Sequence, residues 1–242
     1  MRLKVVIIAL FTGALWAPVV RANVVITGDS ADKLIRKDGS LFDLAIGRVG
    51  SSTSGFSGAG ARSAEFVFQL PAPPANTSPI VSDARLEFTI TADQPDGNYN
   101  IDLYALPGRP EKTVFISDNY TDATSRQTAQ LIESAIVPAT HPAGTLPEVV
   151  GTNLSGSQEL VKYLNDQYGA DGSGAGKWVF LRLNPDTATV PIENSGFDVA
   201  FAENATGQPT LTIDFAPEPT AAPVFVCLAA GAATRRRKRA AR

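Results

Sequence analysis

Acidic side chains are the commonest reactive groups in this chain, whereas histidine and cysteine are scarce. Residues 23–218 hold 24 aspartates and glutamates against 12 lysines and arginines, a formal charge of −12. The one histidine is His141, and the one cysteine, Cys227, lies close to the C-terminus. A disulfide within residues 23–218, a His/Cys metal site and a Cys/His dyad are therefore excluded.

The spacing of the remaining groups gives little support for catalysis. A Ser-His-Asp triad would have to use His141, which precedes Pro142 in a proline-rich loop. We expect an exposed histidine there, in a mobile setting for a base that needs fixed geometry. Glycosidases use two carboxyls roughly 5 to 9 Å apart, and no spacing singles out such a pair. Solvated strand faces explain the acids more simply, so the sequence predicts no enzyme and no cofactor.

Calcium is the ion that the chain suits best, because it takes carboxylate and carbonyl oxygens from loops. Asp93, Asp96 and Asn98, which lie in one turn, are the candidate ligands. Asp29 and Asp32, near the first strand, are a second candidate pair. The turn lacks the full spacing of a known calcium loop, so an ordinary turn is the alternative.

Sugar binding needs aromatic platforms and hydrogen-bonding groups on one exposed face. Tyr104 and Tyr120 are the candidate platforms, because they fall on the polar side of a strand or in a loop. Trp178 has apolar neighbours and is assigned to the core.

Strands with one buried face must position these groups, because apolar and polar residues alternate along most of residues 23–216. In the clearest run, 84–91, Leu86, Phe88 and Ile90 share one face. Another run places Phe66 inward and Glu65 on the opposite, solvent face. Residues 178–183 are apolar on both faces, which predicts a central strand. Further strands are expected at 24–27, 33–36, 44–47, 99–103, 113–117, 198–201 and 211–215.

One helix interrupts the strands. Leu160, Val161, Leu164 and Tyr168 fall at helical spacing, and Gly169 is placed to end the helix. About nine strands and one short helix predict an all-β protein, a jelly-roll-like antiparallel β-sandwich. Segments rich in glycine, serine or proline are expected to be surface loops at 50–61, 71–79 and 137–147.

The first 22 residues have the three parts of a secretory signal peptide. Arg2 and Lys4 precede an apolar run over 5–16, and Val20-Arg21-Ala22 provides a small-residue end. The run is short for a membrane span, which needs about 20 apolar residues. We therefore expect a cleavable signal helix over 1–22, with a retained N-terminal anchor as the alternative.

The C-terminal segment has three parts in a characteristic order. Pro217-Glu218-Pro219 is followed by an apolar stretch over 221–233 and then by Arg235-Arg236-Arg237-Lys238-Arg239. This order resembles the PEP-CTERM sorting signal of Gram-negative bacteria. The resemblance implies that 217–242 is a sorting tail that an exosortase-type membrane peptidase recognises. The apolar helix would then hold the chain transiently in the inner membrane, with the arginines on the cytoplasmic side. A disordered basic tail that binds nucleic acid is the alternative.

A second resemblance runs along the body of the chain. Ala31-Asp32, Ile46-Gly47, the run 63–71 and the run 80–86 follow one another in an order similar to the DNRLRE-type jelly-roll domains. Residues 176–183 and 208–211 resemble the closing strands of that family, which is grouped with carbohydrate-binding modules. The Asp-Asn-Arg-Leu-Arg-Glu string itself is absent, so the resemblance names no specific ligand.

These observations predict an exported protein of the cell surface or extracellular matrix of a Gram-negative-type bacterium. Its β-sandwich, residues 23–216, is expected to be non-catalytic and to contact extracellular polysaccharide. The acidic charge disfavours nucleic acid and anionic membrane partners. A purely structural envelope component without a small ligand is the runner-up, and a glycan-active extracellular enzyme ranks last.

Overall fold

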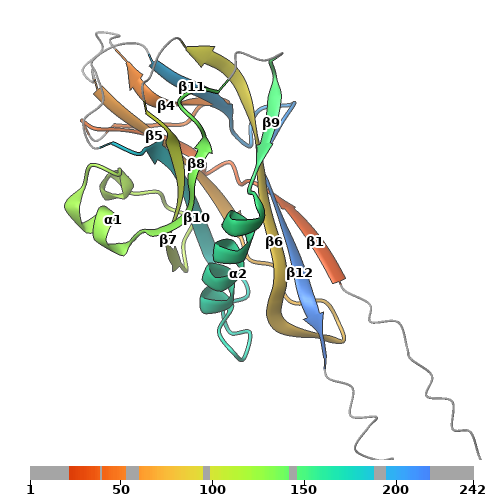
Figure 1. The fold of residues 1–242 in the computed structure, drawn as a ribbon. Helices are drawn as coiled ribbons and strands as arrows, with labels where there is room; N and C mark the ends of the chain where they lie inside the picture. Colours follow the sequence, from red (N-terminus) through yellow and green to blue (C-terminus); the bar gives the residue numbers. More distant parts are fainter. Residues whose placement is uncertain are drawn as a thin grey trace, which may run out of the picture.

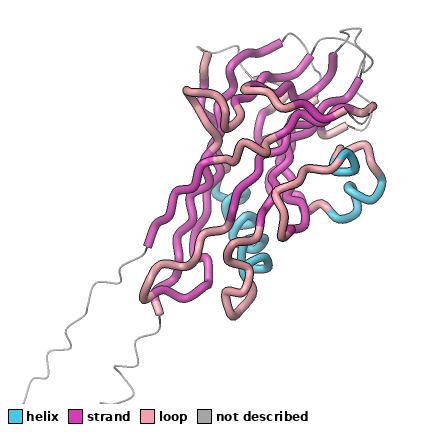
Figure 2. Tube along the Cα trace, turned by 180° about the vertical axis from the view of Figure 1, so that it is seen from behind, coloured by secondary structure: helices cyan, strands magenta, loops and turns pink. Residues whose placement is uncertain are grey.

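The computed structural model describes residues 22–38, 40–52, 60–94, 99–141, 146–187 and 195–218. Their strands pair antiparallel in one sheet that curls back around a core (Figure 1). Viewed from behind, the same part of the chain consists mostly of strands, with short helical segments at its sides (Figure 2). The expected class, an antiparallel all-β protein, is therefore confirmed.

The main path of the sheet contains nine of its strands, and neighbours along it pair in the order β1 (Ala22–Thr27), β12 (Thr210–Pro217), β6 (Thr77–Gln94), β11 (Ser195–Ala200), β4 (Ile46–Ser52), β5 (Gly60–Gln69), β10 (Trp178–Pro185), β7 (Ile101–Arg109) and β8 (Gln130–Val137). Beside this path, β2 (Lys33–Arg36) pairs with β5 and with β3 (Leu41–Phe42), and β9 (Glu148–Gly151) pairs with β6. The helical elements are η1 (Ile116–Asp118), α1 (Ala123–Thr128) and α2 (Leu154–Tyr168).

The core is built from the apolar face of each alternating strand. Leu86, Phe88 and Ile90 of β6 are at most 1% exposed, as the sequence predicts. Phe66 of β5 packs against Phe88 with ring centroids 5.7 Å apart, and against Phe201 at 6.0 Å. Because β5 and β6 are not neighbours in the sheet, these contacts join opposite sides of the curl.

Strand β10 is central, as its apolar pattern predicts, since it pairs with both β5 and β7. Phe180 and Leu181 point to opposite faces of the sheet and both are fully buried. The burial extends to the outer face of β5, where Glu65 is also fully buried. The expectation that Glu65 faces solvent is wrong, because another segment of the chain covers this face.

The covering segment, which we call the strap, is residues 110–129, which connect β7 to β8 and carry η1 and α1. Val114 of the strap packs with Phe180 and Val67 in an apolar cluster that is separate from the main core. Arg109, at the base of the strap, places its guanidinium 4.3 Å from the centre of the Phe180 ring. The outer face of β5, β10 and β7 is therefore an interior surface.

The strand expected at 113–117 is not present, because side chains turn the backbone of the strap. The Asp118 carboxylate accepts a hydrogen bond from the Phe115 N–H at 2.7 Å, which favours η1. Asp122 then caps α1 by accepting from the N–H groups of Thr124 and Ser125. Both caps are local hydrogen bonds that compete with strand pairing.

Helix α2 confirms the helix that the spacing of Leu160, Leu164 and Tyr168 predicts, and at 15 residues it is longer than the short helix expected. Asn153 caps its start by accepting from the Gly156 N–H, and Gly169 ends it with φ of +68°, a conformation that glycine adopts without strain. The helix packs against β6 and β8 (Figure 1). Tyr168 meets Phe215 of β12 edge to face with ring centroids 5.4 Å apart.

The first and last strands lie side by side. Ala22 of β1 pairs with Phe215 of β12, and β12 ends at Pro217. The Glu218 N–H donates to the Asn76 carbonyl at 3.2 Å. The chain therefore enters and leaves this fold at one end of the molecule (Figure 1). Within the described ranges, no helix is long and apolar enough to cross a membrane.

Candidate functional site

A cavity of about 270 Å³ lies between the strap and the sheet, and we call it the tyrosine pocket. Its wall is made by Tyr104, Tyr120, Arg126, Arg182, Asn184, Pro185, Asp186 and Thr187. The strap contributes Tyr120 and Arg126, whereas β7, β10 and the turn after β10 contribute the rest. Pockets for drug-sized ligands measure roughly 300 to 1,000 Å³, so this one suits a single sugar ring.

The fold brings the two tyrosines chosen from the sequence into one site. Tyr104 of β7 is half-buried, and the Arg182 guanidinium lies 5.5 Å from the centre of its ring. Tyr120 is only 3% exposed, so its ring is packed rather than an open stacking platform. Its hydroxyl is buried without a hydrogen-bond partner among the described residues, and burial raises the pKa of the phenol.

Arg182 connects the sheet to the strap from the floor of the pocket. Its Nε donates to the Asn184 side chain at 3.0 Å, and its Nη1 donates to the Asp118 carbonyl and to the Ser125 hydroxyl. The side chain is 1% exposed. Burial lowers the pKa of Arg182 to about 10, while the charges of Glu65 and Asp118 oppose this shift. The guanidinium stays charged at neutral pH.

Glu65, Arg182 and Tyr104 form one row across three neighbouring strands. Arg182 of β10 is directly opposite Glu65 of β5 on one side and Tyr104 of β7 on the other. Directly opposed residues share a face of the sheet. Among the described residues, neither carboxyl oxygen of Glu65 has a hydrogen-bond partner. Burial raises the pKa of this carboxyl well above its usual range, helped by the Asp118 charge.

Two charged residues lie at the mouth of the pocket. Arg126 of α1 is exposed, and its guanidinium makes no hydrogen bond or ion pair within the described part of the chain. The Asp186 carboxylate accepts from the Asn100 side chain at 2.8 Å. The pocket thus places a guanidinium with no partner in the described part of the chain and a carboxylate beside the ring of Tyr104, which suits the hydroxyl groups of a sugar better than an apolar ligand.

A larger surface depression, of about 720 Å³, lies on the other side of the strap. Its wall includes Leu41, Phe115 and Ile116, all of them exposed. We rank it below the tyrosine pocket because it contains none of the unpartnered buried polar atoms found beside β5 and β10.

The candidate calcium ligands are only partly described. Asp93 lies on β6, whereas Asp96 and Asn98 fall outside the described residues. Asp29 forms an ion pair with Lys112 at 3.0 Å. No group of three or more histidine, cysteine, aspartate or glutamate side chains with the spacing of a metal site is present in the ranges that the structure describes.

Asp32, the other member of the second pair, is a structural carboxyl. It is fully buried, and its oxygens accept from the Val67 N–H at 2.7 Å and from the Ala202 N–H at 3.0 Å. Burial raises the pKa of Asp32 to about 8, although both hydrogen bonds act to lower it. The carboxyl ties β5 to the turn after β11.

His141 is packed rather than exposed, contrary to expectation. Its side chain is 11% exposed, with Nε2 3.0 Å from the Glu148 carboxylate. The ring also meets Phe197 edge to face, with centroids 5.8 Å apart. These contacts fix the histidine beside the first residue of β9, and it does not line the tyrosine pocket.

The sorting motif lies mostly beyond the described ranges. Pro217 and Glu218 are described, whereas Pro219 and the arginines Arg235, Arg236 and Arg237 are outside them. No family model matches this sequence, and no curated protein matches it.

Proposed function

We propose that this protein is exported to the cell surface or extracellular matrix, and that its domain contacts extracellular polysaccharide through the tyrosine pocket. The observation that carries this proposal is the pocket itself. Tyr104 and Tyr120 line one cavity together with guanidinium, amide and carboxylate groups. Aromatic surfaces and directed hydrogen bonds are the means by which proteins bind sugar rings.

Export and sorting rest on the two ends of the sequence. The signal peptide directs the chain out of the cytoplasm, and the PEP-CTERM-like tail is the proposed substrate of an exosortase-type membrane peptidase. The adjacent ends of β1 and β12 support this arrangement. A tail that follows β12 would hold this end of the domain close to the inner membrane. The tyrosine pocket would then stay accessible to polysaccharide.

We assign the curled sheet to the jelly-roll type, in line with the resemblance to carbohydrate-binding jelly rolls. A catalytic role ranks below binding, because Asp186 is the only carboxylate among the residues that line the tyrosine pocket. Glycosidase chemistry uses two.

A glycan array probed with the purified protein and with Arg126→Gln tests the proposal. We expect binding to one class of polysaccharide and roughly tenfold weaker binding by the variant, because a hydrogen bond from a charged group contributes about 1.5 kcal/mol. Arg126 is exposed, so the substitution should leave the fold intact.

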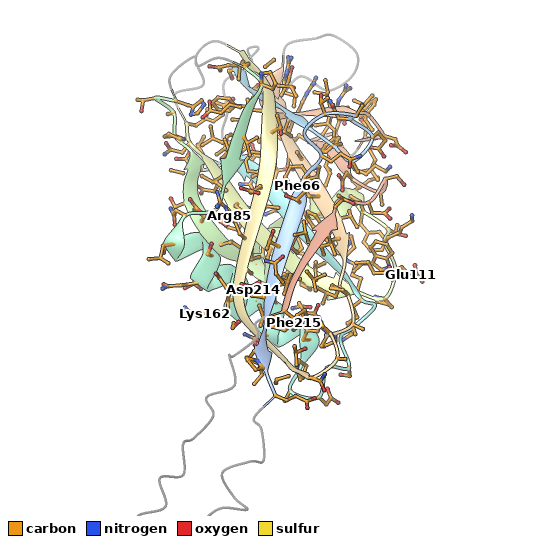
Figure 3. All side chains as sticks on the ribbon, turned by 90° about the vertical axis from the view of Figure 1, so that its right-hand side faces the viewer. Phe66, Arg85, Glu111, Lys162, Asp214 and Phe215 are labelled. Carbon is orange, nitrogen blue, oxygen red and sulfur yellow. The ribbon has the colours of Figure 1, made fainter. Side chains whose placement is uncertain are left out.

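Arg85→Gln is the matched control. Arg85 is an exposed arginine of β6, far from Glu111 of the strap (Figure 3). Equal loss of binding in both variants would indicate general charge attraction rather than a site. If no glycan binds the wild-type protein, the purely structural envelope role takes the place of this proposal.

A further inference from the structure

Polar contacts as well as the apolar cluster around Val114 hold the strap on the sheet, and Arg182 makes two of the polar ones. Its Nη1 donates to the Asp118 carbonyl and to the Ser125 hydroxyl, which are both strap residues. Asn119 adds a hydrogen bond of 3.2 Å to the Ile35 carbonyl of β2, and Arg109 pairs with the Asp118 carboxylate. Removing Arg182 from the strap would therefore weaken its attachment near the centre.

Arg182 is a buried cation whose hydrogen-bond acceptors are all neutral. A buried charge is normally compensated by an opposite charge, since its transfer from water costs several kcal/mol. The carboxyl directly opposite, that of Glu65, is fully buried, and neither of its oxygens has a hydrogen-bond partner in the described part of the chain. The two groups are neighbours that could pair but do not.

We propose that Arg182 is a latch with two alternative partners. With Glu65 neutral, the guanidinium donates to Asp118 and Ser125 and holds the strap closed. With Glu65 ionised, it turns to the carboxylate and releases the strap. The exchange needs no ligand, so it goes beyond the proposed function and does not depend on it.

Several charged or titratable groups surround Glu65, and they act on its proton in opposite directions. They are Arg182 of β10, Lys33 of β2, Asp118 of the strap, Arg109 of β7, Tyr163 of α2 and Asp32. Lys33 is the cross-strand neighbour, but its amine pairs with Asp43 at 2.8 Å. Burial and the Asp118 charge raise the pKa of Glu65, and these outweigh the two arginines.

The direction of the pH response follows from this arrangement. The closed state binds the Glu65 proton more tightly than the open state, in which the carboxylate is paired or hydrated. Opening of the strap therefore releases a proton. The equilibrium constant for opening rises up to about tenfold for each pH unit between the pKa of Glu65 in the open state and its pKa in the closed state. Burial lowers the pKa of Arg182 to about 10, and the charge that forms on Glu65 acts to raise it, so the guanidinium stays charged when the two groups pair.

The latch also controls the tyrosine pocket, which has one wall on the strap and one on the sheet. Tyr120 and Arg126 move with the strap, whereas Tyr104 and Asn184 stay with β7 and β10. Opening the strap takes this site apart and exposes the row from Glu65 to Tyr104. Where the pocket binds a glycan, the latch makes that binding weaker at alkaline pH.

Hydrogen exchange of the purified full-length protein at about pH 6 and about pH 9 tests the latch. Strap amides 115–128 are compared with those of α2, after correction for intrinsic rates. Between the lower and the higher pH, we expect the protection factors of the strap amides to fall at least roughly tenfold more than those of the α2 amides, because opening of the strap is linked to loss of the Glu65 proton. In Glu65→Gln, which mimics the neutral acid, strap protection should be the same at both pH values.

Two further variants keep the test decisive. Glu159→Gln, at a partly exposed position of α2 where the carboxylate pairs with Lys162, should retain the full pH response. Ser125→Ala removes a strap hydroxyl that accepts from Arg182 and donates to the Asp118 carbonyl, and it leaves the sheet unchanged, so it should increase strap exchange already at the lower pH. A wild-type strap with no pH response, an unchanged response in Glu65→Gln, or no effect of Ser125→Ala would each overturn the proposal.

Discussion

Tyr120 carries a buried hydroxyl that has no hydrogen-bond partner among the described residues, whereas most buried polar atoms in proteins have one. An unsatisfied buried hydroxyl costs about 1 to 3 kcal/mol. We predict that Tyr120→Phe raises the free energy of unfolding by about 1 kcal/mol in urea titrations, because the substitution removes only that hydroxyl.

Tyr163→Phe is the matched control for this prediction. The Tyr163 hydroxyl donates to the Leu106 carbonyl at 2.7 Å, so its loss should lower stability by about 1 kcal/mol. If Tyr120→Phe destabilises the protein as much as Tyr163→Phe does, the Tyr120 hydroxyl has a partner after all.

Asp32 gives the domain a second pH dependence. Its pKa is raised to about 8 by burial, above its value of 3.8 in the unfolded chain. Between pH 3.8 and about pH 8 the folded state keeps the Asp32 proton, whereas the unfolded chain has lost it. The contribution of Asp32 to stability is therefore largest at and below pH 3.8, and it falls as the pH rises towards 8. We predict a lower free energy of unfolding at about pH 8 than at about pH 5, by up to about 1.4 kcal/mol per pH unit, measured by urea denaturation.

Asp32→Asn separates this effect from those of other buried acids. An amide does not titrate, so the variant should show a flatter pH dependence, although its stability at low pH is reduced by the poor fit of its NH₂ group to two backbone donors. An unchanged slope would mean that Asp32 is ionised throughout.

At the level of elements, the alternation of apolar and polar residues along β6 leads to a prediction about two neighbouring side chains. Phe88→Ala should lower the free energy of unfolding by about 3 to 5 kcal/mol, because its ring is buried against Phe66. Glu87→Ala should change it by less than about 0.5 kcal/mol, because that side chain is on the outer face with only an exposed pair to Arg85. Urea denaturation of both variants measures the difference, and equal effects would contradict the register.

The elements that sequence reasoning finds are those with strong local patterns. The alternation of β6 and the spacing and terminal glycine of α2 are properties of short windows, so they are visible in the sequence. Such reasoning misses β8 and β9: Glu133 is buried on β8, and β9 covers only Glu148–Gly151, so neither shows a clear alternation. Part of the strap is wrongly predicted as a strand because its turns depend on Asp118 and Asp122, whose carboxylates serve as caps.

The same limit applies to the candidate site. Tyr104 and Tyr120 are candidates from the sequence alone, and the fold brings them together. Sequence reasoning misses Arg182 and Glu65, because a charged residue on an alternating strand is normally assigned to solvent. Only the three-dimensional structure shows that the strap crosses over β10 and buries the outer face of the sheet. The one signal in the sequence is the apolar character of β10 on both faces, which indicates cover without saying which segment supplies it.

On the scale of the whole molecule, the tail makes a separate prediction. A helix over 221–233 would span roughly 20 Å, short of the roughly 30 Å hydrocarbon core, so it is a poor permanent anchor. We therefore predict that the mature protein on its native host lacks residues 235–239, and that replacing these five with serine leaves it unprocessed or released. Intact-mass measurement of surface-extracted protein checks this, and a species that still ends at Arg242 would disprove the sorting proposal.

The central claim is that this exported domain contacts polysaccharide at the tyrosine pocket, and calorimetric titration with the host's own extracellular polysaccharide tests it most directly. The account predicts binding by the wild-type protein and at least roughly fivefold weaker binding by Tyr104→Ala, because a ring contact contributes about 1 kcal/mol or more. Phe115→Ala, which removes a strap aromatic that is 46% exposed and does not line the pocket, should bind as the wild type does. Undiminished binding by Tyr104→Ala, or no binding by the wild-type protein, would contradict the claim.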